Sequence, residues 1–235
     1  MTFTHIFLYV LKVVIFSKNK HCKHLKMKIK LTPNETHSFF SILRQAGYFF
    51  ATIVFAYVLK LIASIYQEKT FIEFGIVENL QLGLLTICIL SFVFQSRLFK
   101  QQSALFLFLG ALCGFALIRE MDGLFDKLIP FISWKFCYLL PLIAGFNLLK
   151  NKKQLKKDLF LFFKTPAFSL MCTAMFIFIP IAQIIGNRGF IGYVVGDGFD
   201  LILIRRLIEE SCECIAYFLL LLSAIEIYFS FKKVK

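Results

Sequence analysis

Apolar runs of about 20 residues recur along this chain, and they limit its fold more than any other feature. A helix that crosses a bilayer needs about 20 predominantly apolar residues. The charged residues stand mostly between the runs. The runs lie at residues 47–66, 79–97, 103–118, 130–149, 163–185 and 211–230. The sequence therefore predicts an all-α fold, a polytopic integral membrane bundle of six transmembrane helices.

The composition argues against other fold classes. Hydrophobic residues make up 59% of the chain, 31 residues are Phe and only 17% are charged. A soluble domain of this size would have more apolar surface than it could bury. The runs lack the alternation of apolar and polar residues that is typical of barrel strands, so helices remain as the way to satisfy the backbone in lipid.

The lysines predict which way the bundle points. Positive charge collects at residues 18–30, at 150–158 and in the tail 232–235, whereas the connection 67–78 is acidic. Loops rich in Lys and Arg stay in the cytoplasm, so we expect both termini there, in the cell (inner or plasma) membrane. Because this charge lies beside apolar helices, the lipid bilayer is the expected partner and nucleic acid is not.

Three parts of the chain follow from this topology. Residues 1–46 are predicted to be a basic cytoplasmic segment, residues 47–231 the six-helix transmembrane domain, and residues 232–235 a basic cytoplasmic tail. The first segment contains an apolar stretch too short to span a bilayer. It is either an interfacial helix or sequence upstream of a true start at Met27.

With this topology, polar residues from several spans gather at the extracytoplasmic end of the bundle. Glu78, Asp122 and Glu213 are the candidate acid or base groups, because each carboxylate lies close to or inside a span end. The expected substrate-binding residues around them are Gln81, Arg119, Glu120, Lys135, Arg205, Arg206, Glu209 and Glu210. We assign no metal and no cofactor to this region.

Depth in the membrane distinguishes some of these residues from ordinary surface charges. Lys60 and Lys135 lie inside predicted spans, where an unpaired charge is costly, so we expect both to join the outer polar cluster. Glu213 lies about one turn inside its span. By contrast, Glu78, Glu209 and Glu210 stand in first helical turns, where a carboxylate is stabilised by the helix dipole without any function.

Two other segments lead to separate expectations. Glu226, near the inner end of its span, is expected to pair with Lys164, Lys232 or Lys233, whose long side chains can reach it. The stretch 186–200 contains five glycines and is predicted to be a lid or a re-entrant loop over the acidic opening.

Three function classes stay open. The first is a non-enzymatic membrane protein with an ionic cluster facing outward, built from the second, third and sixth spans. The second is a membrane-embedded enzyme that acts on a lipid or isoprenoid-type substrate, or on an anionic small molecule, by carboxylate acid–base chemistry. The third is a small proton- or ion-coupled transporter, which would need a polar path across the whole bilayer.

Overall fold

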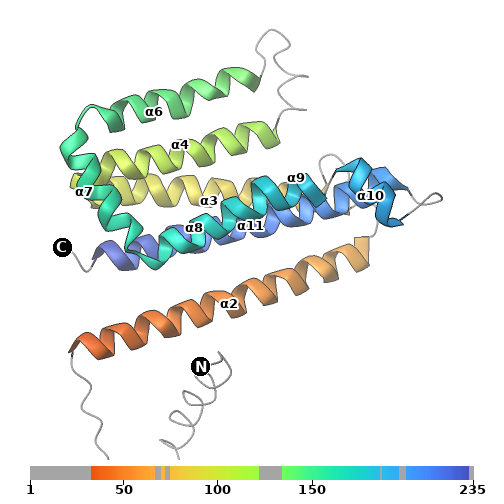
Figure 1. The fold of residues 1–235 in the computed structure, drawn as a ribbon, viewed down its shortest axis with the longest axis horizontal. Coiled ribbons are helices and arrows are strands. Elements are labelled where there is room, and N and C mark those ends of the chain that lie inside the picture. Colours follow the sequence, from red (N-terminus) through yellow and green to blue (C-terminus); the bar gives the residue numbers. More distant parts are fainter. Residues whose placement is uncertain are drawn as a thin grey trace, which may run out of the picture. The chain divides into compact units, whose positions relative to one another are not determined.

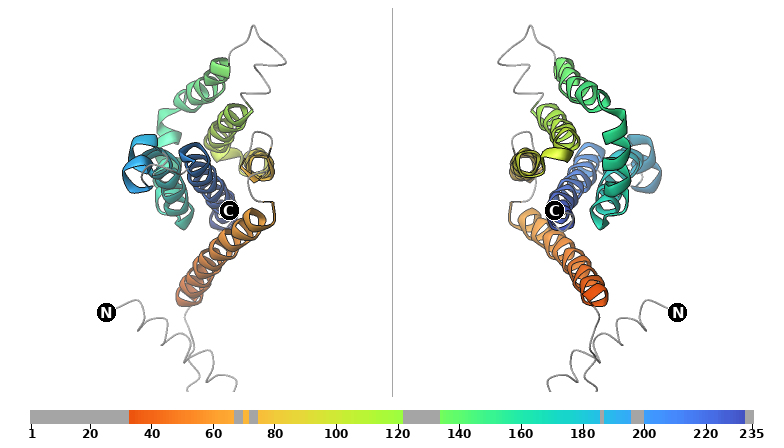
Figure 2. Two further views of the ribbon diagram at one scale, coloured as in Figure 1. Left: turned by 90° about the vertical axis from the view of Figure 1, so that its right-hand side faces the viewer. Right: turned by 90° about the vertical axis from the view of Figure 1, so that its left-hand side faces the viewer.

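The computed structural model describes residues 33–66, 70–71, 75–121, 134–185, 187–195 and 200–232. All regular elements among these residues are helices, which confirms the predicted all-α class. The chain divides into two units, Met1–Arg44 and Gln45–Lys235, and the description below concerns the second. Its helices form a bundle, seen from the side in Figure 1 and nearly end-on in Figure 2.

Five helical segments are long and apolar enough to cross a membrane, which indicates a multi-pass membrane protein. Four of them are α2 (Pro33–Tyr66), α3 (Ile76–Leu98), α4 (Ser103–Glu120), which follows the 3-10 turn η2 (Lys100–Gln102), and α11 (Leu201–Lys232). The fifth segment, Pro166–Ile185, joins α8 (Pro166–Phe176), a π-helical turn η4 (Ile177–Ile181) and α9 (Ala182–Ile185). Pro180 lies in the π turn, where its missing N–H breaks the regular helix pattern.

In the predicted span 130–149, the described apolar helix is shorter than the prediction. The structure has a 3-10 turn, η3 (Trp134–Tyr138), followed by α6 (Leu139–Leu149), and the apolar helical part is only Phe136–Leu149. At about 1.5 Å per residue this helix is shorter than the hydrocarbon core of a bilayer. Residues 130–133 lie outside the described residues.

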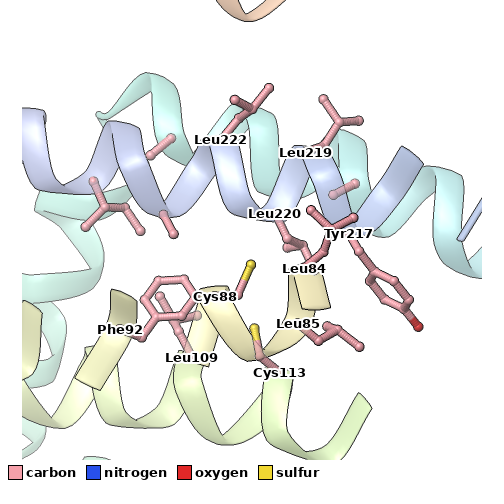
Figure 3. Packing of buried hydrophobic residues seen from close by; sticks show 14 of the residues in the cluster. Leu84, Leu85, Cys88, Phe92, Leu109, Cys113, Tyr217, Leu219, Leu220 and Leu222 are labelled. Atoms are coloured by element: carbon pink, nitrogen blue, oxygen red, sulfur yellow. The ribbon is translucent and has the colours of Figure 1, made fainter. Parts of the chain in front are cut away.

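The core forms where α11 packs between α3 on one side and α8 on the other (Figure 1). Leu85, Cys88 and Phe92 of α3 are fully buried in one apolar cluster with Tyr217 and Leu220 of α11 (Figure 3). Helix α4 packs on the other side of α3. The outward faces are apolar as well, and the side chains of Leu142 and Phe146 on α6 are 65% and 67% exposed. Large apolar residues exposed to this extent fit contact with lipid.

Helix α2 joins the bundle through its contacts with α11. The Tyr48 hydroxyl donates a hydrogen bond to Glu226 Oε2 at 2.8 Å, and the Phe55 ring stacks on Phe218 with centroids 4.2 Å apart. Helix α2 begins at Pro33, well before the predicted start at residue 47. Apolar residues alone marked the predicted start, whereas the helix continues through the polar residues that precede them.

The basic stretch at 150–158 is largely helical. Helix α7 (Lys152–Phe163) exposes its four lysines and buries Asp158 and Phe162. Asp158 accepts hydrogen bonds from Gln154 at 2.8 Å and from Gln102 of η2 at 3.4 Å. Burial raises the pKa of the Asp158 carboxyl, and the two amide hydrogen bonds oppose this rise. With its apolar face inward and its lysines outward, α7 resembles an interfacial membrane helix.

The glycine-rich segment is not simply a loop. Helix α10 (Arg188–Val195) occupies most of it and packs against α11 and α9. Residues 186 and 196–199 lie outside the described residues. Residues 188–195 thus form a helix where the sequence predicted a loop, with Ile191 buried and Phe190 exposed, and the predicted role as a lid stays a prediction.

Candidate functional site

The C-terminal turn of α4, the first half of α11 and the start of α3 bring a set of polar side chains together. We call this set the carboxylate cluster, and it consists of Gln81, Arg119, Glu120, Glu210, Glu213 and Tyr217. Five of the six are residues that the sequence analysis placed at the outer end of the bundle. Helix α11 supplies three of them, because residues 210, 213 and 217 follow one face of a helix with 3.6 residues per turn.

Arg119 is shared between two carboxylates. Its Nη2 atom lies 2.9 Å from Glu120 Oε1 and 2.9 Å from Glu213 Oε1, and the side chain of Glu213 is only 5% exposed. The guanidinium also stands 4.8 Å from the centroid of the Phe178 ring, in the π turn that contains Pro180. Such a cation–π contact stabilises a partly desolvated charge. Arg119 therefore joins three helical segments at one point.

Tyr217 is a member of the cluster that the sequence analysis missed. Its buried hydroxyl donates a hydrogen bond to Glu120 Oε1 at 2.6 Å. The available signal was its spacing: Tyr217 follows Glu213 by four residues and therefore shares its helix face. Phe178 was missed as well, and nothing in its local sequence distinguishes it from the many other phenylalanines.

Glu210 has a different kind of partner. Gln81 Nε2 donates a hydrogen bond to Glu210 Oε2 at 2.9 Å and another to the Glu210 backbone carbonyl at 3.0 Å. The Gln81 side chain is fully buried, and its Oε1 atom has no hydrogen-bond partner among the described residues. A buried carbonyl without a donor is costly, so this oxygen can accept a hydrogen bond from one more donor.

Other predicted residues lie at the rim of the cluster. Arg205 Nε contacts Glu209 Oε2 at 3.1 Å, and this i, i+4 pair is partly exposed. Arg206 is exposed. Glu78 is half buried in the first turn of α3, one turn before Gln81.

Lys60 is not part of the cluster. Its side chain is exposed on α2, and no contact to a cluster residue is found among the described residues. The expectation that it pairs at depth was wrong because a Lys stem can extend along the outside of a helix toward water instead. Asp122 lies outside the described residues, and for Lys135 only the backbone is described.

Glu226 is fully buried at the other end of α11. It accepts hydrogen bonds from the hydroxyls of Tyr48 and Ser230, at 2.8 and 3.2 Å. Lys164 and Lys232 were expected near it, but their ammonium groups stand over the rings of Phe160 and Tyr228, at 4.0 and 5.7 Å. Lys233 lies outside the described residues. Two of the lysines that the sequence analysis had paired with Glu226 thus make cation–π contacts with nearby aromatic rings.

Two cavities are found away from the cluster. One, of about 580 Å³, is lined by residues from the α3–α4 turn and by Phe231, and the other, of about 400 Å³, lies between α4 and α6. Among the described residues, no group of three or more His, Cys, Asp and Glu side chains is arranged to hold a metal ion.

The chain was compared with models of protein families, with curated proteins and with solved structures. None of the three comparisons finds a match. The functional argument below therefore depends on the contacts, burial and charges of the cluster itself.

Proposed function

We propose that this protein is a multi-pass membrane protein that takes up protons at the carboxylate cluster. The observation that carries the proposal is the excess of acid over base among the partly to fully buried side chains of the cluster. Glu120, Glu210 and Glu213 are three carboxylates, and Arg119 is the one cation that contacts them among the described residues. If all three were ionised, the cluster would carry two uncompensated negative charges inside a candidate span.

Charge of this kind is expensive in a membrane. An ionised carboxylate away from water costs several kcal/mol unless a cation or several hydrogen bonds compensate it. One guanidinium compensates two carboxylates poorly, because the two negative charges also repel each other. The lowest-cost solution is to keep part of the cluster protonated, which makes it a reversible proton store.

Glu210 is the position where the proton fits best. Its carboxylate has an amide as its partner in place of a cation, and the Oε1 atom of the same amide lacks a donor. A proton on Glu210 removes the charge and makes the carboxyl a hydrogen-bond donor, the kind of group that the unpaired Gln81 oxygen lacks. Glu213 instead contacts Arg119, whose positive charge favours the ionised carboxylate.

Infrared spectroscopy of the protein in lipid nanodiscs tests this proposal. Protonated carboxyl groups absorb separately from carboxylates, so their signal can be followed against pH. We expect a protonated carboxyl at neutral pH in the natural protein, and we expect Glu210→Gln to remove it. The matched control is Glu209→Gln, next to Glu210 but paired with Arg205. The proposal fails if the signal is absent at neutral pH or if both variants lose it equally.

The orientation that goes with this function is part of the proposal. Both termini and the lysines of α7 would face the cytoplasm of the cell membrane, and the carboxylate cluster would face the opposite side. The distribution of lysine along the sequence supports this orientation. The cluster would then sample the pH of the external compartment.

Proton transport is a second candidate function, supported by buried polar groups farther along the bundle. Gln95, Ser223 and Glu226 are each at most 1% exposed, and Gln95 Nε2 donates to the Ala224 carbonyl at 2.8 Å. These groups extend the buried polar positions of α3 and α11 toward the end opposite the carboxylate cluster. They supply part of the polar path that a transporter would need.

Proteoliposomes separate transport from proton storage. If the protein transports protons, liposomes that contain it should dissipate an imposed pH gradient faster than empty liposomes, as a trapped pH-sensitive dye would report. Glu226→Gln should remove this difference, whereas Glu209→Gln should not. Equal rates with and without protein would reject transport and leave the infrared test of the cluster unaffected.

A further inference from the structure

We infer that the cavity at the α3–α4 turn is a binding site for a phosphate group, most simply the headgroup of an anionic phospholipid. This cavity is separate from the carboxylate cluster and independent of the proposed proton uptake. Its volume of about 580 Å³ lies within the range of about 300–1,000 Å³ that is typical of small-ligand sites.

The charge of the cavity is one-sided. Arg97 and Lys100 line it, and none of the described residues that line it carries a carboxylate. Both basic side chains are exposed, and neither has an ion-pair partner among the described residues. An Arg guanidinium can hold two phosphate oxygens at once, and a Lys ammonium adds a compact charge, so the pair suits a phosphate.

The opposite wall is aromatic. Phe99 and Phe231 line the cavity, and each is at most 5% exposed. Their ring centroids lie 6.1 Å apart, and Phe106 packs against both at 5.9 and 5.3 Å. These contacts fix the wall, so the basic groups stand against a rigid apolar surface. A lipid presents this combination of a charged phosphate next to apolar chains.

The position of the cavity also favours a membrane lipid. It lies where the candidate span α3 turns back into the segment Lys100–Glu120, at the depth where headgroups meet the hydrocarbon region. Gln101 and Gln102 complete its polar side, and Gln102 contacts Asp158 of α7. The four exposed lysines of α7 therefore belong to the same end of the bundle (Figure 1), but they are not among the residues that line the cavity.

Native mass spectrometry of the full-length protein in detergent tests the site. Phosphatidylglycerol and phosphatidylcholine are titrated separately, and inorganic phosphate is added as a competitor. We expect the natural protein to retain phosphatidylglycerol more strongly than phosphatidylcholine. The double variant Arg97→Gln/Lys100→Gln should lower the affinity for phosphatidylglycerol by about 25-fold, since each of the two basic groups near a headgroup contributes about fivefold.

The matched control variant removes two positive charges from helix α7 in place of the cavity. Lys153→Gln/Lys156→Gln takes two exposed lysines from the outer face of α7 and should leave binding within about twofold of the natural protein. Thermal unfolding of both double variants shows whether they stay folded. Competition by inorganic phosphate would identify free phosphate as a ligand of the site, and retention without competition would identify the lipid.

Two results would overturn the inference. If the two double variants lose affinity to the same extent, the lipid responds to the total positive charge and not to the cavity. If a folded Arg97→Gln/Lys100→Gln variant binds phosphatidylglycerol as the natural protein does and neither protein binds phosphate, the cavity has no such ligand.

Discussion

Arg119 is the residue on which the stability of the carboxylate cluster depends most directly. Replacement by Leu would leave Glu120 and Glu213 close together without their shared cation. Loss of one partner from a largely buried ion pair costs up to about 3–5 kcal/mol, and because Arg119 is 32% exposed we expect about 2 kcal/mol. Thermal unfolding in detergent should therefore show a clearly lower midpoint for Arg119→Leu.

Arg205→Leu is the control for that measurement. Arg205 and Glu209 form a partly exposed pair within one helix, which is worth only about 0.3–0.5 kcal/mol. Its unfolding midpoint should stay close to that of the natural protein. Equal shifts for the two variants would contradict the view that Arg119 holds the cluster together.

At the scale of single residues, the sequence located the charges near the helix ends better than it predicted the partners of those charges. Glu213 was singled out because it lies too deep in a span for simple solvation, and the structure places it against Arg119, another of the predicted residues. Tyr217 and Phe178 were missed, since a Tyr or Phe in an apolar helix looks the same whether it faces lipid or a buried charge. Only the neighbouring helices distinguish the two cases.

At the scale of elements, the contact between α3 and α4 depends on Gly110. A Cβ atom at this position would lie 3.3 Å from Phe92 Cβ, closer than most such contacts, whereas one at Gly83 would have open space around it. We expect Gly110→Leu to push the helices apart and cost about 1–3 kcal/mol, while Gly83→Leu stays neutral or stabilises its helix. Thermal unfolding of the two variants makes the comparison.

The stabilities of the two variants can be compared directly, because both substitutions add the same side chain to an apolar transmembrane helix. A loss of stability for Gly83→Leu as large as that for Gly110→Leu would show that the close approach is not the cause. The small residue at 110 is required by another helix and not by its own, so local sequence gave no sign of it.

Helix boundaries also depend on contacts that local apolar length does not reveal. Apolar length located the long helices, but it placed the starts of α2 and α11 too late, because a helix continues into polar residues when a cap or a neighbour supports it. Asp200 shows this for α11: its Oδ1 atom accepts hydrogen bonds from the backbone N–H groups of Ile202 and Leu203, at 3.0 and 3.1 Å. A carboxylate that caps a helix in this way fixes its first turn.

For the whole molecule, the prediction concerns orientation. Lys153 on α7 and Asn187 after α9 are both exposed, and the span-length segment Pro166–Ile185 separates them. In a protein whose own cysteines have been replaced, a thiol reagent that cannot cross membranes should label Asn187→Cys in intact cells. It should label Lys153→Cys only after the membrane is opened. Labelling of both residues in intact cells would contradict the topology and the external position of the carboxylate cluster.

The sequence by itself determined the all-α class, the positions of the long apolar helices and the charges at their ends, because the cost of an unpaired backbone in lipid makes apolar length sufficient evidence. Only the tertiary structure decided which of those charges meet. It joined Arg119 to Glu213 and Gln81 to Glu210 and left Lys60 outside. Pairing depends on the rotation of each helix about its axis, and that rotation is set by packing against neighbours far away in the sequence.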